Sequence, residues 1–308
     1  MIADFFNKTK PINFLILNIF SILVYFTAVI INFSDENYTS SFIYISFYLF
    51  FFLLFLFIHN FITRKNKLTS DNSYALLIFI LLFALFPKTF ANYKILISNF
   101  FLFFAIRRIY SLRSLFETKS KLFDSAFWIG LATLFYSWSI AYLILIYVAI
   151  IVFRKIKWNY FIIPIIGFIT PIYLYYVYLL IVNKEQLFSK IWSFSFGFDY
   201  TNYNDLNLLL PIAIILVFIM WSIYPTLKKS LKAKKYKKVT YTLLLIHLFL
   251  ALILAIISPI KDGSEFIFLF FPFSILFTKY LQTVKDYWFK EAILIMFLIL
   301  SIVVTFLY

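Results

Sequence analysis

The sequence contains no cysteine, only four glycines and only two histidines among its 308 residues. The lack of cysteine excludes disulfides, thiolate metal sites and a cysteine nucleophile. Four scattered glycines can form neither a G-x-G-x-x-G pattern nor a P-loop, so we expect no nucleotide cofactor. Two histidines cannot build a multi-histidine iron centre, and we expect His59 and His247, which lie in apolar stretches, to be packed side chains.

Charge is also scarce, because 13% of the residues are charged whereas 64% are hydrophobic and 24% are aromatic. A soluble domain carries about 25% charged residues, so this composition indicates a polytopic membrane protein. The formal net charge of +15 requires no nucleic acid, since basic residues gather on the inner face of membrane proteins. We therefore expect membrane lipids, and no nucleic acid, as partners.

The stretch Lys228–Lys238 sets the orientation, because seven of its eleven residues are lysine and apolar runs flank it. Short loops rich in Lys and Arg stay on the cytoplasmic side. Near the N-terminus, Lys8 and Lys10 precede an apolar run of about 20 residues, which is too long for the apolar region of a signal peptide. We interpret this run as an uncleaved signal anchor in the inner membrane of a bacterium.

Counting outward from this lysine cluster predicts an all-α transmembrane bundle, a single domain over residues 1–308, with the N-terminus in the cytoplasm and the C-terminus outside. In this arrangement the inner segments hold 23 of the 28 Lys and Arg residues. The eleven expected crossings are 12–32, 42–62, 74–86, 90–110, 122–136, 140–153, 160–182, 208–227, 239–260, 266–278 and 292–307.

Several segments carry more specific expectations. The crossing at 74–86 is short, so we expect it to tilt little, to continue past Pro87 or to be shielded by its neighbours. Prolines within 160–182 are expected to bend that helix. We expect Asp124 to cap a helix N-terminus and the long outer loop, residues 183–207, to contain a short interfacial helix.

The outer face carries the candidate chemistry. Asp35 and Glu36 follow the first crossing, and adjacent acids can supply one general base and one metal or hydrogen-bond ligand. A divalent metal therefore stays open as a cofactor. Further along, a lysine and two acids in the sequence KDGSE precede a proline-bearing apolar helix. The plainer interpretation is that acids occupy outer loops because bases are kept away from them.

Two tracts resemble the GT-C superfamily, the membrane glycosyltransferases that take sugar from a polyprenyl-phosphate carrier on the outer face. FDSAFWIGLATLFYSWSIAYLILIYVAIIVFRK, residues 123–155, looks like that family's central hairpin. SPIKDGSEFIFLFFPFSILF, residues 258–277, looks like its late proline-bearing segment. The first outer loop is shorter than in that family, and no large C-terminal soluble domain is evident. The chain is also similar to uncharacterised membrane proteins of Bacteroidota, a likeness that implies no mechanism.

The resemblance implies a fold, a partner and site residues. By position it makes Asp35 or Glu36 the catalytic group, and it places Lys261, with Lys88 or Lys94, at the phosphate of the lipid carrier. The implied partner is a polyprenyl-phosphate-linked sugar, and the implied activity is that of a membrane glycosyltransferase or of a relative that only binds such lipids.

Two other classes are open. A non-enzymatic subunit of an envelope export or assembly complex, with membrane proteins as partners, would explain the short first loop and the lack of a strong motif. A transporter has less support, because no inverted repeat is visible and His247 is the only titratable group near the middle of a span. An enzyme requires Asp35 and Lys261 on one cavity, whereas a scaffold does not.

Overall fold

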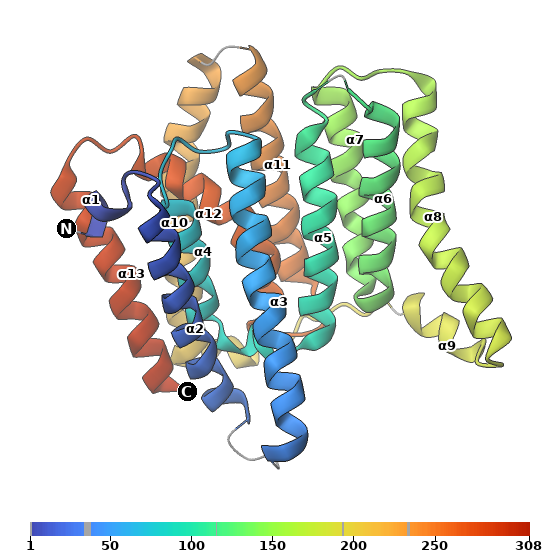
Figure 1. The fold of residues 1–308 in the computed structure, drawn as a ribbon, viewed down its shortest axis with the longest axis horizontal. Coiled ribbons are helices and arrows are strands. Elements are labelled where there is room, and N and C mark those ends of the chain that lie inside the picture. Colours follow the sequence, from blue (N-terminus) through green and yellow to red (C-terminus); the bar gives the residue numbers. More distant parts are fainter. Residues whose placement is uncertain (1, 34–37, 115, 193, 233–234) are drawn as a thin grey trace. The chain divides into compact units, whose positions relative to one another are not determined.

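The structure is a computed structural model that describes residues 2–33, 38–114, 116–192, 194–232 and 235–308. These residues form helices and no strands (Figure 1), so the prediction of an all-helical chain is confirmed for them. The chain divides into two compact units. Unit 1 comprises Met1–Asn92, Asp199–Leu231 and Ile260–Tyr308, and unit 2 comprises Tyr93–Phe198 and Lys232–Pro259.

Unit 1 is built from both ends of the chain and a central segment. Its α-helices are α1 (Ile2–Phe6), α2 (Pro11–Phe33), α3 (Tyr38–Lys65), α4 (Tyr74–Leu85), α10 (Leu206–Lys232, to Leu231 in this unit), α12 (Ile267–Leu281) and α13 (Tyr287–Leu307). Its 3-10 helices are η1 (Pro87–Phe90), η4 (Thr201–Asn204) and η5 (Ser264–Phe266).

Two short helices, α4 and α12, form the core of unit 1, and every residue of both is buried. The ring centroids of Phe83 and Phe270 lie 4.9 Å apart, and Phe86 stacks on Phe266 at 5.0 Å. Aromatic pairs at such distances contribute about 0.5–1.5 kcal/mol each. Because lipid tails are as apolar as these side chains, close packing holds α4 against α12.

The helices packed around α4 explain how so short a helix can lie at the third expected crossing. The 12 residues of α4 span about 18 Å, well below the hydrocarbon thickness of about 30 Å. Helices α2, α3, α12 and α13 contact α4, and the chain continues past Pro87 as the 3-10 helix η1. Of the three expectations for this segment, the structure bears out the shielding. Helix α4 itself does not continue past Pro87, because Phe86 leaves the helical conformation (φ −128°, ψ 69°) and η1 is a separate helix.

The two ends of unit 1 are distinct. At one end, Ser70 donates a hydrogen bond to Gln282 at 3.1 Å, and the backbone N–H of Ala3 donates to Glu291 at 2.8 Å. We call this the basic end, because Lys8, Arg64, Lys65 and Lys67 lie in the segments that meet there. We call the opposite end the KDGSE end; it is formed by Pro87–Phe90, Asp199–Asp205, Lys261–Phe266 and Tyr308.

Unit 2 holds the middle of the chain and one returning helix. Its elements are α5 (Tyr93–Ser111), α6 (Thr118–Phe135), η2 (Ser137–Ala141), α7 (Tyr142–Val152), α8 (Trp158–Ile181), α9 (Gln186–Ser189), η3 (Lys190–Trp192) and α11 (Lys235–Ile257). The described part of residues 183–207, which leaves out residue 193, thus contains a single turn of α-helix, α9, the 3-10 helices η3 and η4, and the start of α10.

Glycines let α6 and α8 approach closely within unit 2. A Cβ atom on Gly130 would lie 2.5 Å from Cγ of Pro171, and a Cβ atom on Gly167 would lie 2.6 Å from the carbonyl oxygen of Phe123. Small residues at helix contacts are the usual means of close packing in membranes. Pro164 and Pro171 lie inside α8, and Figure 1 shows this helix changing direction along its length, as expected from its prolines.

The position of Asp124 differs from the expectation. Helix α6 begins at Thr118, so Asp124 lies beyond its first turn and cannot cap its N-terminus. Its carboxylate instead forms an ion pair with Arg108 of α5, with a nitrogen–oxygen distance of 2.6 Å. The prediction was wrong because the polar residues that precede the apolar run already belong to the helix.

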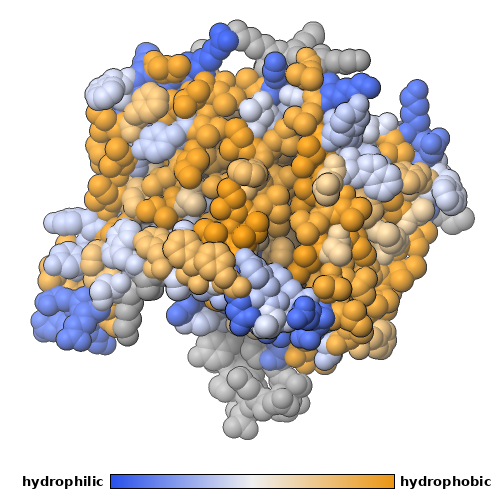
Figure 2. All heavy atoms as spheres, turned by 180° about the vertical axis from the view of Figure 1, so that it is seen from behind, coloured by the Kyte–Doolittle hydropathy of each residue, from blue (hydrophilic) through white to orange (hydrophobic). Residues whose placement is uncertain are grey.

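The length and apolar composition of the helices are those of a membrane protein. Seven of those described, α2, α3, α8, α10, α11, α12 and α13, include stretches long and apolar enough to cross a membrane. Each of the eleven expected crossings coincides with one helix, although α4 and α7 are shorter and α5 and α6 are less apolar. Hydrophobic residues make up most of the surface drawn in Figure 2, and hydrophilic residues form smaller groups on it.

Candidate functional site

The loop that leads into α12 is held by its own acids. Asp262 Oδ1 accepts hydrogen bonds from the backbone N–H and the hydroxyl of Ser264, at 2.9 and 2.6 Å. Glu265 is fully buried, and its Oε2 accepts the N–H of Gly263 at 2.9 Å. The other oxygen, Oε1, accepts the phenolic O–H of Tyr203. The KDGSE sequence therefore folds into a closed turn around one buried carboxylate.

Gly263 is required by this turn for two reasons. Its φ is +97°, in the left-handed region that other residues rarely adopt. A Cβ atom at this position would also lie 2.8 Å from Cδ2 of Leu208 and 3.2 Å from Cδ1 of Phe86. A side chain at this position would force Leu208 to shift, in addition to the backbone strain.

Lys261 is enclosed by aromatic rings and is 5% exposed. Its Nζ lies 4.8 Å from the ring centroid of Tyr200 and 5.9 Å from that of Tyr203, within range of cation–π attraction. Burial lowers the pKa of Lys261, and the charge of Glu265 acts in the opposite direction. Burial also raises the pKa of Tyr203, with Glu265 adding to this effect.

The turn that carries these tyrosines is itself anchored. Asp199 Oδ1 accepts the N–H and the hydroxyl of Thr201, at 3.1 and 2.8 Å, and these bonds lower the pKa of Asp199. Asn202 donates from Nδ2 to the carbonyl oxygen of Lys261 at 3.2 Å. The segment before α10 is thereby fastened to the loop before α12.

Lys88 and Tyr308 form a second part of the KDGSE end. The Nζ atom of Lys88, which is half-buried, lies 5.5 Å from the ring centroid of Tyr308. The hydroxyl of Tyr308 is buried and has no hydrogen-bond partner among the described residues. Burial raises the pKa of Tyr308, and three acids of this end act in the same direction: Asp262, Glu265 and Asp205.

An apolar groove adjoins this pair. It has a volume of about 280 Å³ and is lined by Thr27, Ile30, Ile31, Thr305 and Tyr308, from α2 and the end of α13. The two threonine hydroxyls donate to carbonyl oxygens of their own helices, so they leave the groove apolar.

The comparisons with known proteins give one result. Residues 15–308 match the sequence profile of a family of unknown function (DUF6427). The chain belongs to this family. The match begins within α2 and includes every residue of the KDGSE end. No curated protein and no solved structure matches the DUF6427 chain.

The candidate residues chosen from the sequence separate into three groups. Lys88 and Lys261 both lie at the KDGSE end of unit 1. Lys94 is exposed in the first turn of α5, in unit 2. Asp35 and Glu36 lie outside the described residues, just beyond the end of α2. Near that end, Asn32 donates from Nδ2 to the carbonyl oxygen of Pro87 at 2.9 Å.

Glu265 and Tyr203 were not singled out from the sequence as site residues. The signal for Glu265 was present, because it is an acid placed immediately before a wholly apolar helix. Tyr203 gave no such signal, since it lies among many aromatic residues of an outer loop. In the part of the chain that the structure describes, no group of three His, Cys, Asp or Glu side chains gathers as a metal site.

Both histidines are fully buried, as expected. His59 stacks on Phe79, with ring centroids 4.4 Å apart, and its Nε2 lies 2.9 Å from Oγ of Ser274. In unit 2, Nε2 of His247 lies 3.3 Å from the hydroxyl of Tyr142.

Proposed function

We propose that this DUF6427 chain is a GT-C-like protein of the bacterial inner membrane that binds or acts on lipid-linked sugar at the outer leaflet. One observation carries the proposal: the apolar groove beside Lys88 and Tyr308. A polyprenyl phosphate combines an apolar chain with an anionic head, and the groove and the lysine offer a complement to each part.

The distribution of charge supports the orientation. Basic side chains concentrate at the basic end of unit 1, whereas acids accompany Lys88 and Lys261 at the KDGSE end. Under the positive-inside rule the basic end is cytoplasmic and the KDGSE end faces outward. Helix α1 lies at the basic end and Tyr308 at the other, which agrees with a cytoplasmic N-terminus, an outer C-terminus and an odd number of crossings, for which we propose eleven.

The proposed reaction is a transfer of sugar to a hydroxyl group. Asp35 or Glu36 takes the proton from the acceptor hydroxyl, whose oxygen forms a bond to the anomeric carbon of the sugar. The bond from that carbon to the carrier phosphate breaks, and the phosphate leaves with the electron pair. Lys88 stabilises its negative charge from the rim, and Lys261 adds positive potential from inside the KDGSE end.

The catalytic part is tested in cells. The double variant Asp35→Asn, Glu36→Gln is compared with wild type for surface glycans and lipid-linked intermediates at equal membrane abundance. Loss of a glycan with the protein retained supports the reaction. An unchanged profile contradicts it. Glu185→Gln, which neutralises an exposed acid of another outer loop, serves as the matched control.

The binding part is tested separately with a photoreactive polyprenyl phosphate. We expect Lys88→Gln to reduce crosslinking to the purified protein, because the phosphate loses its partner at the rim of the groove. The control is Lys184→Gln, a loss of the same charge at an exposed loop position. Equal crosslinking in all three proteins would contradict lipid-phosphate binding at Lys88.

A second candidate is favoured by another observation. Asp262, Ser264 and Glu265 satisfy one another and their neighbours, as in a structural clamp. This arrangement fits a non-enzymatic subunit of an envelope export or assembly complex. An unchanged glycan profile, together with co-purification of a membrane partner that depends on the chain, would favour this candidate.

A further inference from the structure

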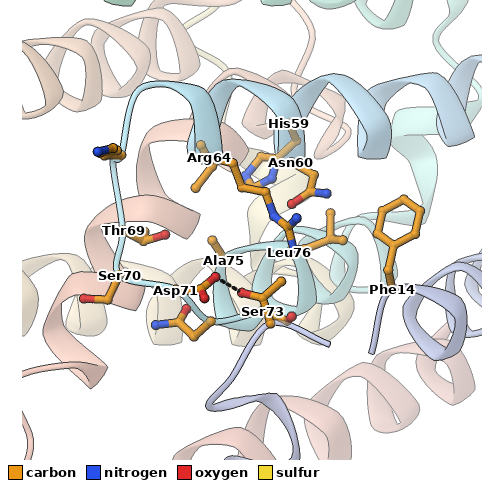
Figure 3. A pocket seen from close by; sticks show the side chains of 14 residues that line it. Phe14, His59, Asn60, Arg64, Thr69, Ser70, Asp71, Ser73, Ala75 and Leu76 are labelled. Carbon is orange, nitrogen blue, oxygen red and sulfur yellow. Dashed lines mark hydrogen bonds between the residues drawn. The ribbon is translucent and has the colours of Figure 1, made fainter. Parts of the chain in front are cut away.

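The basic end of unit 1 contains a cavity of about 370 Å³ that the proposed function does not use. It lies between the last turns of α3 and the first turn of α4, opposite the KDGSE end (Figure 3). Most of the residues that line it are of polar types; the lining comprises Thr9, Phe14, His59, Asn60, Thr63, Arg64, Lys67, Thr69, Ser70, Asp71, Asn72, Ser73, Ala75 and Leu76.

Among the residues that the structure describes, three lining side chains have buried polar atoms without a hydrogen-bond partner: Nδ1 of His59, Oγ1 of Thr63 and Oδ1 of Asn72. His59 is 0% exposed and Thr63 is 5% exposed. A buried polar atom without a partner destabilises the protein by about 1–3 kcal/mol. These three atoms belong to residues that line one cavity, so a ligand that reaches them through a small shift of the lining side chains would satisfy them.

The tautomer of His59 follows from its neighbour. Ser274 uses its only hydroxyl proton on the carbonyl oxygen of Phe271, at 2.9 Å. We therefore assign the imidazole proton of His59 to Nε2, which then donates to Oγ of Ser274. Nδ1 is consequently an acceptor, and a ligand must bring a donor to it.

The cavity thus presents two kinds of groups. Its acceptors are Nδ1 of His59, Oδ1 of Asn72 and the carboxylate of Asp71, which already accepts the hydroxyl of Thr9 at 2.5 Å. Its donors are the hydroxyl of Thr63 and the exposed cations Arg64 and Lys67. Figure 3 shows Arg64 extending from α3 toward the first turn of α4, with His59 and Asn60 beside it.

The ends of α3 and α4 that border the cavity also carry partial charges of opposite sign. The C-terminal end of α3 carries partial negative charge, and the N-terminal end of α4 carries partial positive charge together with free N–H groups. A ligand with one positive and one negative group complements both ends, whereas a simple anion leaves the acceptors unsatisfied.

We propose that this cavity binds a phosphate ester of ethanolamine, free or as a lipid head group. The phosphate oxygens bind Arg64, Lys67 and Thr63, and the ammonium group donates to His59, Asn72 and Asp71. The cavity is large enough for such a group, since ligand sites begin at about 300 Å³. The proposal is independent of the chemistry at the KDGSE end.

The first test compares ligands on the purified full chain. Binding of O-phosphoethanolamine is measured by equilibrium dialysis against O-phosphocholine, which has the same charges but no N–H donor. We expect O-phosphocholine to bind at least about tenfold more weakly than O-phosphoethanolamine, because it leaves the buried acceptors unsatisfied. Nanodiscs of phosphatidylethanolamine or phosphatidylcholine, followed by native mass spectrometry, test the lipid form.

The second test uses variants. Thr63→Val removes a hydroxyl that bonds no other protein group among the described residues, so we expect an undiminished melting temperature together with weaker binding, by about tenfold. Arg64→Gln is expected to weaken binding as well. Lys65→Gln is the matched control, since it removes one charge from the same turn of α3 but does not line the cavity.

Each outcome decides the proposal. Binding of soluble phosphoethanolamine supports a small-molecule site, and retention of phosphatidylethanolamine alone supports a head-group site. Three results would overturn it. The choline and ethanolamine forms bind equally, neither form binds at all, or Arg64→Gln and Thr63→Val bind the ligand as well as wild type does.

Discussion

The phenolic O–H of Tyr203 donates a hydrogen bond to the carboxylate of Glu265, 62 positions further along the chain. This bond joins the η4 turn to the start of α12 and partners a carboxylate that is fully buried. The KDGSE end therefore depends on contacts between segments that are distant in sequence.

Removing this donor should destabilise unit 1. In Tyr203→Phe the carboxylate of Glu265 keeps its place but loses one of its donors, so we expect a stability loss of about 1–3 kcal/mol. The measurement is the melting temperature of the purified protein in detergent. Tyr224→Phe, at a 71% exposed tyrosine of α10, should leave it unchanged. Equal melting temperatures for both variants would show that the bond contributes nothing.

A side chain at Gly263 should also be destabilising, through backbone strain and through contact with Leu208. We expect Gly263→Ala to lower stability by at least about 1 kcal/mol. The loss should be smaller in a Leu208→Ala background, because the contact disappears while the strain at φ +97° remains. A double-mutant cycle measures the difference, and strict additivity would exclude the contact as a cause.

Lys261 should give unit 1 a distinctive dependence on pH. Burial lowers its pKa below the ordinary 10.5, so in the range between the folded and unfolded pKa values the unfolded chain binds more protons. Stability should therefore rise with pH as the ammonium loses its proton in the folded protein. Below this range Lys261 is charged in the folded protein, and the full cost of burying that charge lowers stability. Lys261→Met should remove the rise in melting temperature, and a slope equal to that of wild type would contradict this account.

The contact between α6 and α8 predicts a defect in unit 2. Gly130→Ala places a methyl group 2.5 Å from Cγ of Pro171 and 2.6 Å from the carbonyl oxygen of Phe168, so the helices must separate. We expect a loss of about 1–3 kcal/mol, as for overpacked cores, measured by thermal melting. Ala149→Gly, also in a helix of unit 2, would lose helix propensity without any clash and is the comparison.

The apolar runs were sufficient to predict the helices, because in a hydrocarbon environment a long apolar segment must satisfy its own backbone. The boundaries depended on polar residues, and Asp124 was misplaced for that reason. The same rule could not reveal what surrounds each helix: α4 and α8 are both apolar in sequence, yet α4 is wholly buried and Ile166 of α8 is 54% exposed.

The site residues were harder to predict. Lys261 was singled out because it precedes a proline-bearing apolar helix, the position that the GT-C resemblance implies for a phosphate-binding base. Its enclosure by Tyr200 and Tyr203 depends on where a distant loop returns. The cavity at the basic end was missed because its key atoms, on His59 and Thr63, belong to a helix that is apolar as a whole. Unsatisfied hydrogen bonds become visible only when neighbouring helices are in place.

The burial of α4 against α12 bears on how the protein is made. Helix α4 leaves the ribosome long before α12, which completes its protein surroundings. Until α12 is synthesised, α4 has lipid or the insertion machinery on the side that α12 later covers. The core of unit 1 is thus completed near the end of translation, and a chain truncated before residue 267 should enter membranes yet remain an easy substrate for quality-control proteases.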